Sequence, residues 1–358
     1  MDSEKGIQGT EMVDTDARLS ELLELADQAG RHALTGAYEP IARAAKDAAD
    51  ELEPAVRRLL STGRTADAMA MTTGLHTFWQ DSGRADLGQS LAEAALEAAE
   101  NDPTIAGSLR ARTMLTAGEM AFRQGDQSAA AAWSGSAVAE ATAADDPVTA
   151  ALAEVSLARI AFREGDAGRI ESFSRQALDR AGSDPRVQRA AFHMLAWAAH
   201  TAGDRPLAID WFERSLTVRR AMDDPFGIAV ELSNLGDMAM ETGDLARAAS
   251  YIEDALKTAV RLENLYLLTS LIGSCGAMAG EAGHAEEAAT LLAAADAAYA
   301  STSLVPDPGT REMMDAAAEK ARAALAAEDA ETAEAIGGAM TWSDAATRAI
   351  DLCHRLKG

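Results

Sequence analysis

Charged side chains at helical spacing are the first candidates for chemistry in this 358-residue sequence. Arg159 and Arg163 are four residues apart, so they share one face of a helix. Two neighbouring guanidinium groups can bind a carboxylate or a phosphate through paired hydrogen bonds. The alternative is that Glu119 and Asp237, on flanking segments, neutralise these arginines. Both interpretations give the arginines an anionic partner.

Histidines and acidic pairs are the next candidates. His193 and His200 are seven residues apart, about two helical turns, which is too far for the i, i+4 pair that holds a single metal ion. Asp145-Asp146 and Asp223-Asp224 fit helix N-caps better than paired catalytic carboxylates, because they fall between apolar segments. We therefore expect no metal site and no cofactor.

Motifs that would identify an enzyme are missing from the sequence. There is no GxSxG, no HExxH and no nucleophile with a credible base. These absences favour a non-catalytic protein. The alternative is an enzyme recruited from a binding groove, in which a buried acid or base has a shifted pKa. Its candidate residues are His193, His200, Asp237 and Glu241.

Composition limits the classes of partner. The 32 basic and 57 acidic residues give a net charge of -25, which repels nucleic acid and anionic lipid. No apolar run is long enough to span a membrane and the N-terminus is polar, so a cytoplasmic protein is predicted. Cys275 and Cys353 are far apart in sequence, and we expect both to be structural free thiols.

The elements that position these residues follow from a repeat. A glycine followed by a polar residue recurs at intervals of 42, 40, 38, 40 and 40 residues. These turn glycines are Gly83, Gly125, Gly165, Gly203, Gly243 and Gly283. Apolar residues at helical spacing surround each glycine, which predicts a helix, a tight turn and a second helix. Stacked units of this kind bury a continuous core and form an all-α solenoid.

Further signals separate the units. The pairs Asp102-Pro103, Asp146-Pro147, Asp184-Pro185 and Asp224-Pro225 lie between them. Aspartate can cap the free N–H groups of a helix, and proline is tolerated in its first turn. We therefore expect a first helix to begin at each pair.

The repeat resembles the tetratricopeptide repeat. The best match is Asn234-Leu235-Gly236 with Ala239, followed by Ala248 and Ile252. Units of about 40 residues indicate longer helices than the usual 34-residue repeat. The resemblance implies a right-handed superhelix of antiparallel helix pairs with a concave binding face.

Longer segments resemble the sensor region of large LuxR-like and SARP-like transcription regulators. They are residues 22–83, the second helices typified by "ARAASYIEDAL", and residues 288–352. In those regulators the array implies a sensor that signals to an ATPase and a DNA-binding domain. This sequence has no P-loop and no basic helix-turn-helix after Leu352, which predicts a free-standing sensor or adaptor.

The predicted organisation has four parts. Residues 1–20 form a polar, disordered N-terminus, 21–61 a helical cap, 62–300 the repeats and 301–358 C-terminal capping helices. The terminal helices must cover the last apolar face of the array. As an alternative, their apolar side forms a homodimer face.

The tetratricopeptide resemblance also implies which residues line the groove. They stand ten, nine, six, three and two positions before a turn glycine: Thr116, Glu119, Phe122, Arg123, Ser156, Arg159, Phe162, Arg163, His193, Met194, Trp197, His200, Ser233, Asn234, Asp237, Met240 and Glu241. In peptide-binding relatives an asparagine at the position of Asn234 bonds the ligand backbone. Phe122, Phe162 and Trp197 could instead pack between helices.

The leading hypothesis follows from this mixed aromatic and polar lining. It is a binding module that captures a small molecule or a peptide in its groove and acts on a regulatory protein partner. The alternative is a scaffold that binds proteins through its outer surface or its terminal helices.

Overall fold

The computed structural model describes residues 3–302, 304–306 and 308–357. Every regular element in these residues is an α-helix. The N-terminal helices are α1 (Ser3–His32), α2 (Tyr38–Asp47), α3 (Ala49–Ser61), α4 (Thr65–Gly74), α5 (His76–Asp81) and α6 (Ala85–Ala99). The paired helices are α7 (Gly107–Arg123), α8 (Gln127–Ala143), α9 (Pro147–Arg163), α10 (Ala167–Ala181), α11 (Pro185–Thr201), α12 (Arg205–Ala221), α13 (Pro225–Glu241), α14 (Leu245–Arg261), α15 (Leu265–Glu281) and α16 (Ala285–Ala300). The last three are α17 (Pro308–Ala324), α18 (Ala327–Gly338) and α19 (Trp342–Lys357). None of the described helices is long and apolar enough to cross a membrane.

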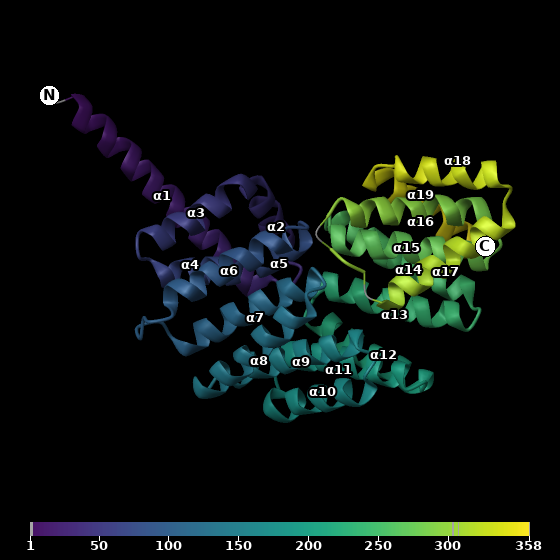
Figure 1. The fold of residues 1–358 in the computed structure, drawn as a ribbon, viewed down its shortest axis with the longest axis horizontal. Coiled ribbons are helices and arrows are strands. Elements are labelled where there is room, and N and C mark those ends of the chain that lie inside the picture. Colours follow the sequence, from purple (N-terminus) through teal and green to yellow (C-terminus); the bar gives the residue numbers. More distant parts are fainter. Residues whose placement is uncertain (1–2, 303, 307, 358) are drawn as a thin grey trace.

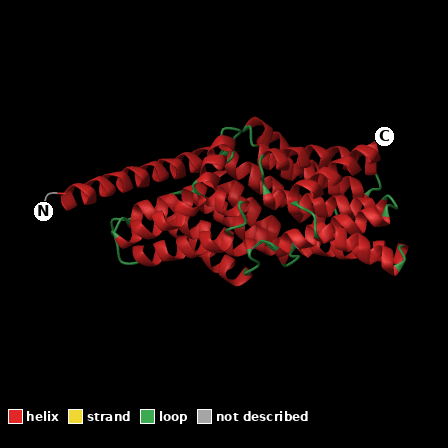
Figure 2. Ribbon diagram, turned by 90° about the horizontal axis from the view of Figure 1, so that it is seen from above, coloured by secondary structure: helices red, strands yellow, loops and turns green. Residues whose placement is uncertain are grey.

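The helices pack as successive pairs along the chain. α7 packs on α8, α9 on α10, α11 on α12, α13 on α14 and α15 on α16, and each pair stacks on the next. Figure 1 shows the resulting arc, in which α8 to α12 connect a group of N-terminal helices with a group of C-terminal helices. Seen from above in Figure 2, the first turns of α1 project beyond the other helices. The predicted all-α repeat array is confirmed. Residues 3–20, however, belong to α1, in the segment expected to be disordered.

A left-handed glycine and an aspartate cap build the turn inside each pair. All six turn glycines have φ between 70° and 82°, and Gly63, at 74°, adds a seventh turn of this kind. A positive φ costs glycine little, because it has no Cβ to clash with the backbone. In the turns at Gly125, Gly165, Gly203 and Gly243 the next residue is an aspartate whose carboxylate accepts an N–H from the second helix. Chain reversal is therefore a local property of the sequence.

Aspartate also starts the first helices of three units. Asp146, Asp184 and Asp224 each accept a backbone N–H of the helix that follows. Asp145 and Asp223 precede two of these caps and both take a φ of 54°, so each acidic pair combines a left-handed turn with a cap. The prediction for Asp102-Pro103 was wrong. Asp102 accepts hydrogen bonds from Thr104 within a turn, and α7 begins only at Gly107.

Small residues let the two helices of a pair approach closely. A Cβ added to Gly236 would lie 2.7 Å from Cγ1 of Ile252, and one added to Gly276 would lie 2.7 Å from Cγ of Leu292. In both cases the partner is 16 residues later, in the second helix of the same pair. Gly236 and Ile252, two residues of the tetratricopeptide match, are therefore in close packing contact.

Gly236→Ala is expected to lower the free energy of unfolding by about 1–2 kcal/mol, because the added methyl group must displace Ile252. Gly135→Ala is the matched control, since Gly135 is exposed in α8 and its added Cβ would meet open space. Alanine should stabilise that helix by about 0.5–1 kcal/mol. Urea unfolding followed by circular dichroism measures both changes. Equal effects of the two substitutions would contradict the close approach.

The two ends of the array meet. Arg261 at the end of α14 pairs with Glu39 of α2, and Glu263 after α14 pairs with Lys46 of α2. The N–H of Val305 donates to the carbonyl of Arg123 at 3.2 Å, which adds a backbone contact between distant parts of the chain. Figure 1 shows α2 and α5 facing the C-terminal helices across this junction. The arc is therefore closed by polar contacts.

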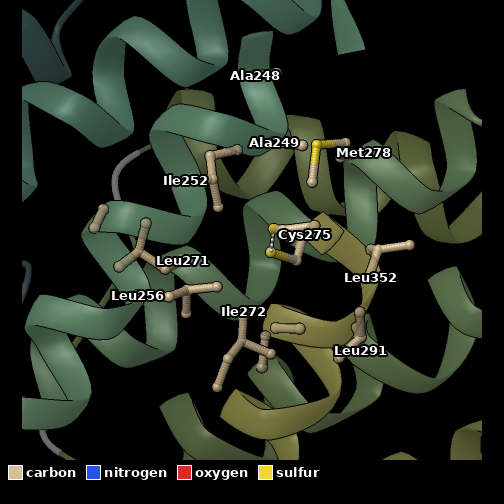
Figure 3. Close-up of a cluster of buried hydrophobic side chains, with 14 of the residues drawn as sticks. Ala248, Ala249, Ile252, Leu256, Leu271, Ile272, Cys275, Met278, Leu291 and Leu352 are labelled. Carbon is tan, nitrogen blue, oxygen red and sulfur yellow. Dashed lines mark hydrogen bonds between the residues drawn. The ribbon is translucent and has the colours of Figure 1, made fainter. Parts of the chain in front are cut away.

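The terminal helices cover the last pairs and enclose both cysteines. α18 packs on α16, while α19 packs on α14 and α15. Cys275 lies in the apolar cluster with Ile252, Met278 and Leu352 that Figure 3 shows, and its sulfur is 3.8 Å from that of Cys353. The fold thus brings two free thiols that are distant in sequence into contact. The hydrogen bond with Cys353 and burial raise the pKa of the Cys275 thiol, which keeps it protonated.

Candidate functional site

The first helices of successive pairs hold most of the predicted site. α7 packs on α9, α9 on α11, and α13 on α15. Side chains six positions before the turn glycines, together with their charged neighbours, meet where these helices adjoin. We call this set the inner row, and its members are Glu119, Arg159, Arg189, His193, Glu231 and Asp237.

Glu119 is the centre of the N-terminal part of the inner row. Its carboxylate accepts from Nη1 of Arg159 at 2.6 Å and from Oγ of Ser156 at 3.1 Å, and lies 2.8 Å from Nε2 of His76. Burial alone would raise the pKa of Glu119, but the positive charges of His76 and Arg159 hold that pKa below its usual range. Arg159 is therefore neutralised by Glu119, which is the alternative predicted from the sequence.

Arg163 and the aromatic residues pack between neighbouring helices. The guanidinium of Arg163 donates to the carbonyl of Phe122 and lies 3.7 Å from the centre of its ring. The rings of Phe162 and Trp197 are 4.7 Å apart, and Trp197 also contacts Phe212. These contacts join α7 to α9 and α9 to α11. The aromatic side chains thus stabilise the stacking of the repeats.

Glu231 is the centre of a second, fully buried cluster. It has 0% exposure and accepts from Oγ of Ser215 at 2.6 Å and from Nε of Arg219 at 2.9 Å. Nδ1 of His193 lies 3.1 Å away, and the amide of Asn234 donates to the same carboxylate at 3.2 Å. Burial opposes ionisation, yet His193 and Arg219 lower the pKa of Glu231 to about 2.

Two predicted groove residues, His193 and Asn234, belong to this second cluster. Nε1 of Trp197 donates to Nε2 of His193 at 3.2 Å, so His193 in its neutral form carries its proton on Nδ1, toward Glu231. Asn234 is only 8% exposed and its amide is already used. The side chain that the tetratricopeptide resemblance assigned to a ligand backbone donates here to Glu231.

Asp237 lies in a third group with His200 and Glu241. Nε2 of His200 is 3.0 Å from Glu241, which also accepts from Arg205. Oδ1 of Asp237 is buried and has no hydrogen-bond partner. Burial raises the pKa of Asp237 to about 7, Ser274 opposes the change, and the charge of Glu241 adds to it. The four acid–base candidates thus divide into His193 beside Glu231 and the other three around Glu241.

The register inferred for the groove needs correction at one position. The residues nine positions before the turn glycines are buried in all four units of the predicted groove: Thr116, Ser156, Met194 and Asn234. Phe122 and Ser233 are buried as well. The cause is that adjacent first helices pack on one another, which covers this position. The partly or fully exposed members of the set are Glu119, Arg123, Arg159, Phe162, Arg163, His193, Trp197, His200, Asp237, Met240 and Glu241.

Sequence reasoning missed several residues of the inner row and its neighbours. Glu231 and Arg189 stand twelve and fourteen positions before their turn glycines, outside the register considered, and His76 belongs to the short helix α5. The available signal was a charge inside an apolar run, as in "GIAVELSNLG" around Glu231. Such a charge is rarely buried without a partner, so it indicates an internal ion pair.

Arg189 is the least satisfied cation of the inner row. Its side chain is 14% exposed, its nearest acidic oxygen is Oδ2 of Asp224 at 3.9 Å, and its Nε donates to no acceptor. Burial and then the charge of Arg219 lower the pKa of Arg189 to about 10, with Arg159 acting in the same direction. Three guanidinium groups therefore lie near one another, and one has unused hydrogen-bonding capacity.

A cleft of about 570 Å³ lies elsewhere, at the junction of the two ends of the array. It is lined by residues of α2, α5, α14, α15 and α19 and by none of the predicted groove residues. Among the described residues, no three His, Cys, Asp or Glu side chains are grouped as metal ligands would be.

Comparisons with known proteins bear on the fold. No protein-family model matches the sequence, and no curated protein does. A Rap protein, solved in complex with Competence and Sporulation Factor, is 13% identical with a TM-score of 0.53, over 87% of this chain and 99% of the Rap chain. The apo form of RapI is 12% identical with a TM-score of 0.44, over 95% and 98% of the two chains. BtubC from P. vanneervenii is 18% identical with a TM-score of 0.47, over 60% and 92%. The likeness to the first Rap protein supports the helical fold. The more specific resemblance to LuxR-like sensor regions stays a prediction.

Proposed function

We propose that this chain is a non-catalytic binding module that captures an anionic small molecule or the carboxylate of a peptide on its inner row. Occupancy would change how the array is presented to a regulatory protein partner. The observation that carries this proposal is the guanidinium of Arg189, held beside Arg159 and Arg219 with an unpaired Nε.

The charge distribution supports an anionic ligand. The whole chain carries a net charge of -25, so an anion is repelled from most of the surface. Around Arg189 the charged neighbours include the cations Arg219 and Arg159 as well as the anions Asp224 and Glu119. A carboxylate can accept two parallel hydrogen bonds from one guanidinium, which satisfies both the charge and the free donor.

The architecture supports the same assignment. Solenoids of helix pairs present extended inner surfaces on which ligands bind. The Rap protein of similar fold was solved with Competence and Sporulation Factor bound. Trp197 and Phe162 are partly exposed, lie on the same helices as Arg189 and Arg159, and offer apolar contact area. This combination of aromatic and charged groups suits a peptide terminus or an organic acid.

The test is a titration of the full chain with a panel of organic acids and of short peptides with a free or an amidated C-terminus. Tryptophan fluorescence and calorimetry report binding. Arg189→Gln should weaken the binding of each anionic ligand at least tenfold, since it removes a charge-assisted hydrogen bond. Arg175→Gln, on the exposed face of α10, is the matched control and should change nothing. Binding that is independent of Arg189, or no binding by any member of the panel, would refute the assignment.

A further inference from the structure

The cleft at the junction of the array is separate from the inner row and has two distinct walls. Tyr38 and Ala42 of α2 and Phe78 of α5 form one wall. Leu265 and Leu268 of α15 form the other, and Val260 and Trp342 also line the cleft. Most of this lining is apolar, and a volume of about 570 Å³ is that of sites for small organic molecules.

The charges at the rim of the cleft are paired with one another. Lys46 pairs with Glu263, and Arg261 pairs with Glu39. Both ion pairs connect α2 with the segment at the end of α14, so they hold the two walls together. Arg84 lies 3.9 Å from Asp50 and donates to a backbone carbonyl. The ion pairs of the rim therefore hold the junction closed, and the carboxylates of Glu39 and Glu263 are already paired.

Two residues that line the cleft each have a buried polar atom without a partner. Tyr38 is only 8% exposed, and its buried hydroxyl makes no hydrogen bond. Oδ1 of Asp81 is also buried and unpartnered. Buried polar groups in folded proteins nearly always have a partner, so two unpartnered groups on residues that line one cavity point to a missing ligand.

The charge states of Asp81 and Tyr38 indicate the chemistry of that ligand. Burial raises the pKa of Asp81 to about 7, while Asn264, Arg123 and His76 act in the opposite direction. Burial, and then the charge of Asp81, raise the pKa of Tyr38, so its oxygen is a neutral hydroxyl. A carboxylate oxygen and a phenol oxygen both accept hydrogen bonds, and an ammonium group supplies several donors together with the opposite charge.

We propose that this cleft binds a small organic amine. Its ammonium group would lie between the hydroxyl of Tyr38 and the carboxylate of Asp81, and its apolar or aromatic body would lie along Phe78 and Trp342. Aromatic rings attract cations and cover apolar ligands equally well, which suits this lining. The bound amine would touch both ends of the array and strengthen their junction.

Three probes of similar shape and different charge test the proposal on the full chain. They are 2-phenylethylamine, 2-phenylethanol and 3-phenylpropionate, titrated by calorimetry and by ligand-observed NMR. The amine should bind at least tenfold more tightly than the alcohol or the acid. Asp81→Asn keeps the size of the side chain. It should weaken the binding of the amine at least tenfold and remove the preference for the amine over the alcohol and the acid. Tyr38→Phe should weaken the binding of the amine about threefold.

Controls keep the result interpretable. Glu171→Gln, on the exposed side of α10, should bind the amine as the unmodified chain does. Circular dichroism confirms that each variant is folded, and Trp342→Ala, at the start of α19, provides a second lesion should Asp81→Asn fail to fold. Trp342→Ala should weaken the binding of the amine about fivefold. Equal binding of the three probes, or amine binding unchanged by both Asp81→Asn and Trp342→Ala, would overturn the proposal.

Discussion

Glu231→Gln is expected to lower the free energy of unfolding by about 3–5 kcal/mol, the largest loss from any single substitution considered for this chain. The carboxylate is fully buried and accepts hydrogen bonds from Ser215, Arg219 and Asn234. Glutamine keeps the shape of the side chain but removes the charge that compensates Arg219, which is itself only 5% exposed. It also turns an amide N–H₂ toward groups that are already donors.

The matched control is Glu171→Gln, which breaks an exposed ion pair with Arg175 on α10. Its cost should stay below about 0.5 kcal/mol, since exposed pairs four residues apart on a helix contribute little. Urea unfolding followed by circular dichroism measures both variants at pH 7. A loss of less than about 1 kcal/mol for Glu231→Gln would mean that the buried cluster contributes no more than surface pairs do.

The fold was predictable because its determinants are local. Gly243 ends a helix with a positive φ, and Asp244 caps the next one, within two adjacent residues. Repetition of this signal about every 40 residues predicts the number and direction of the paired helices. Asp102 shows the limit of the same signal. Its carboxylate serves a turn at Thr104, because four further residues separate it from α7.

The site was only partly predictable because its contacts depend on curvature. Glu119 meets Arg159 one repeat away, and the register of the helices was sufficient to foresee that pair. The contact between Lys46 and Glu263 joins residues more than 200 positions apart. It depends on small rotations summed over all the intervening pairs, which no local pattern encodes. The cleft at the junction could therefore be found only in the folded chain.

The burial of the residues nine positions before the turn glycines also depends on the neighbouring helices. Asn234 was inferred to face a ligand because the tetratricopeptide resemblance implies that role for its position. In this chain Glu231, three residues earlier, takes the amide of Asn234 as a hydrogen-bond donor. The tetratricopeptide resemblance predicts which helix lines the concave face. The neighbouring charges decide which side chains on that helix remain free to bind.

Asp237→Asn is expected to stabilise the chain at pH 8 by about 3 kcal/mol and to have little effect at pH 4. Burial raises the folded-state pKa of Asp237 to about 7 from an ordinary value of 3.8. Between these two values the folded state keeps a proton that the unfolded state has lost, so stability falls as the pH rises. Above pH 7 the carboxylate is ionised in both states and the full penalty is present. Each pKa unit corresponds to about 1.4 kcal/mol, which sets a ceiling of roughly 4 kcal/mol that solvent screening reduces.

The physical cause of this penalty is specific to the third group of the inner row. Oδ1 of Asp237 has no partner, and the charge of Glu241 repels an ionised neighbour. Asparagine carries no charge, so thermal unfolding should show the variant gaining stability over the unmodified chain between pH 4 and pH 8. Asp254→Asn, on the exposed face of α14, should stay within about 0.5 kcal/mol at both pH values. A gain for Asp237→Asn that is equal at the two pH values would show that burial of charge is not its source.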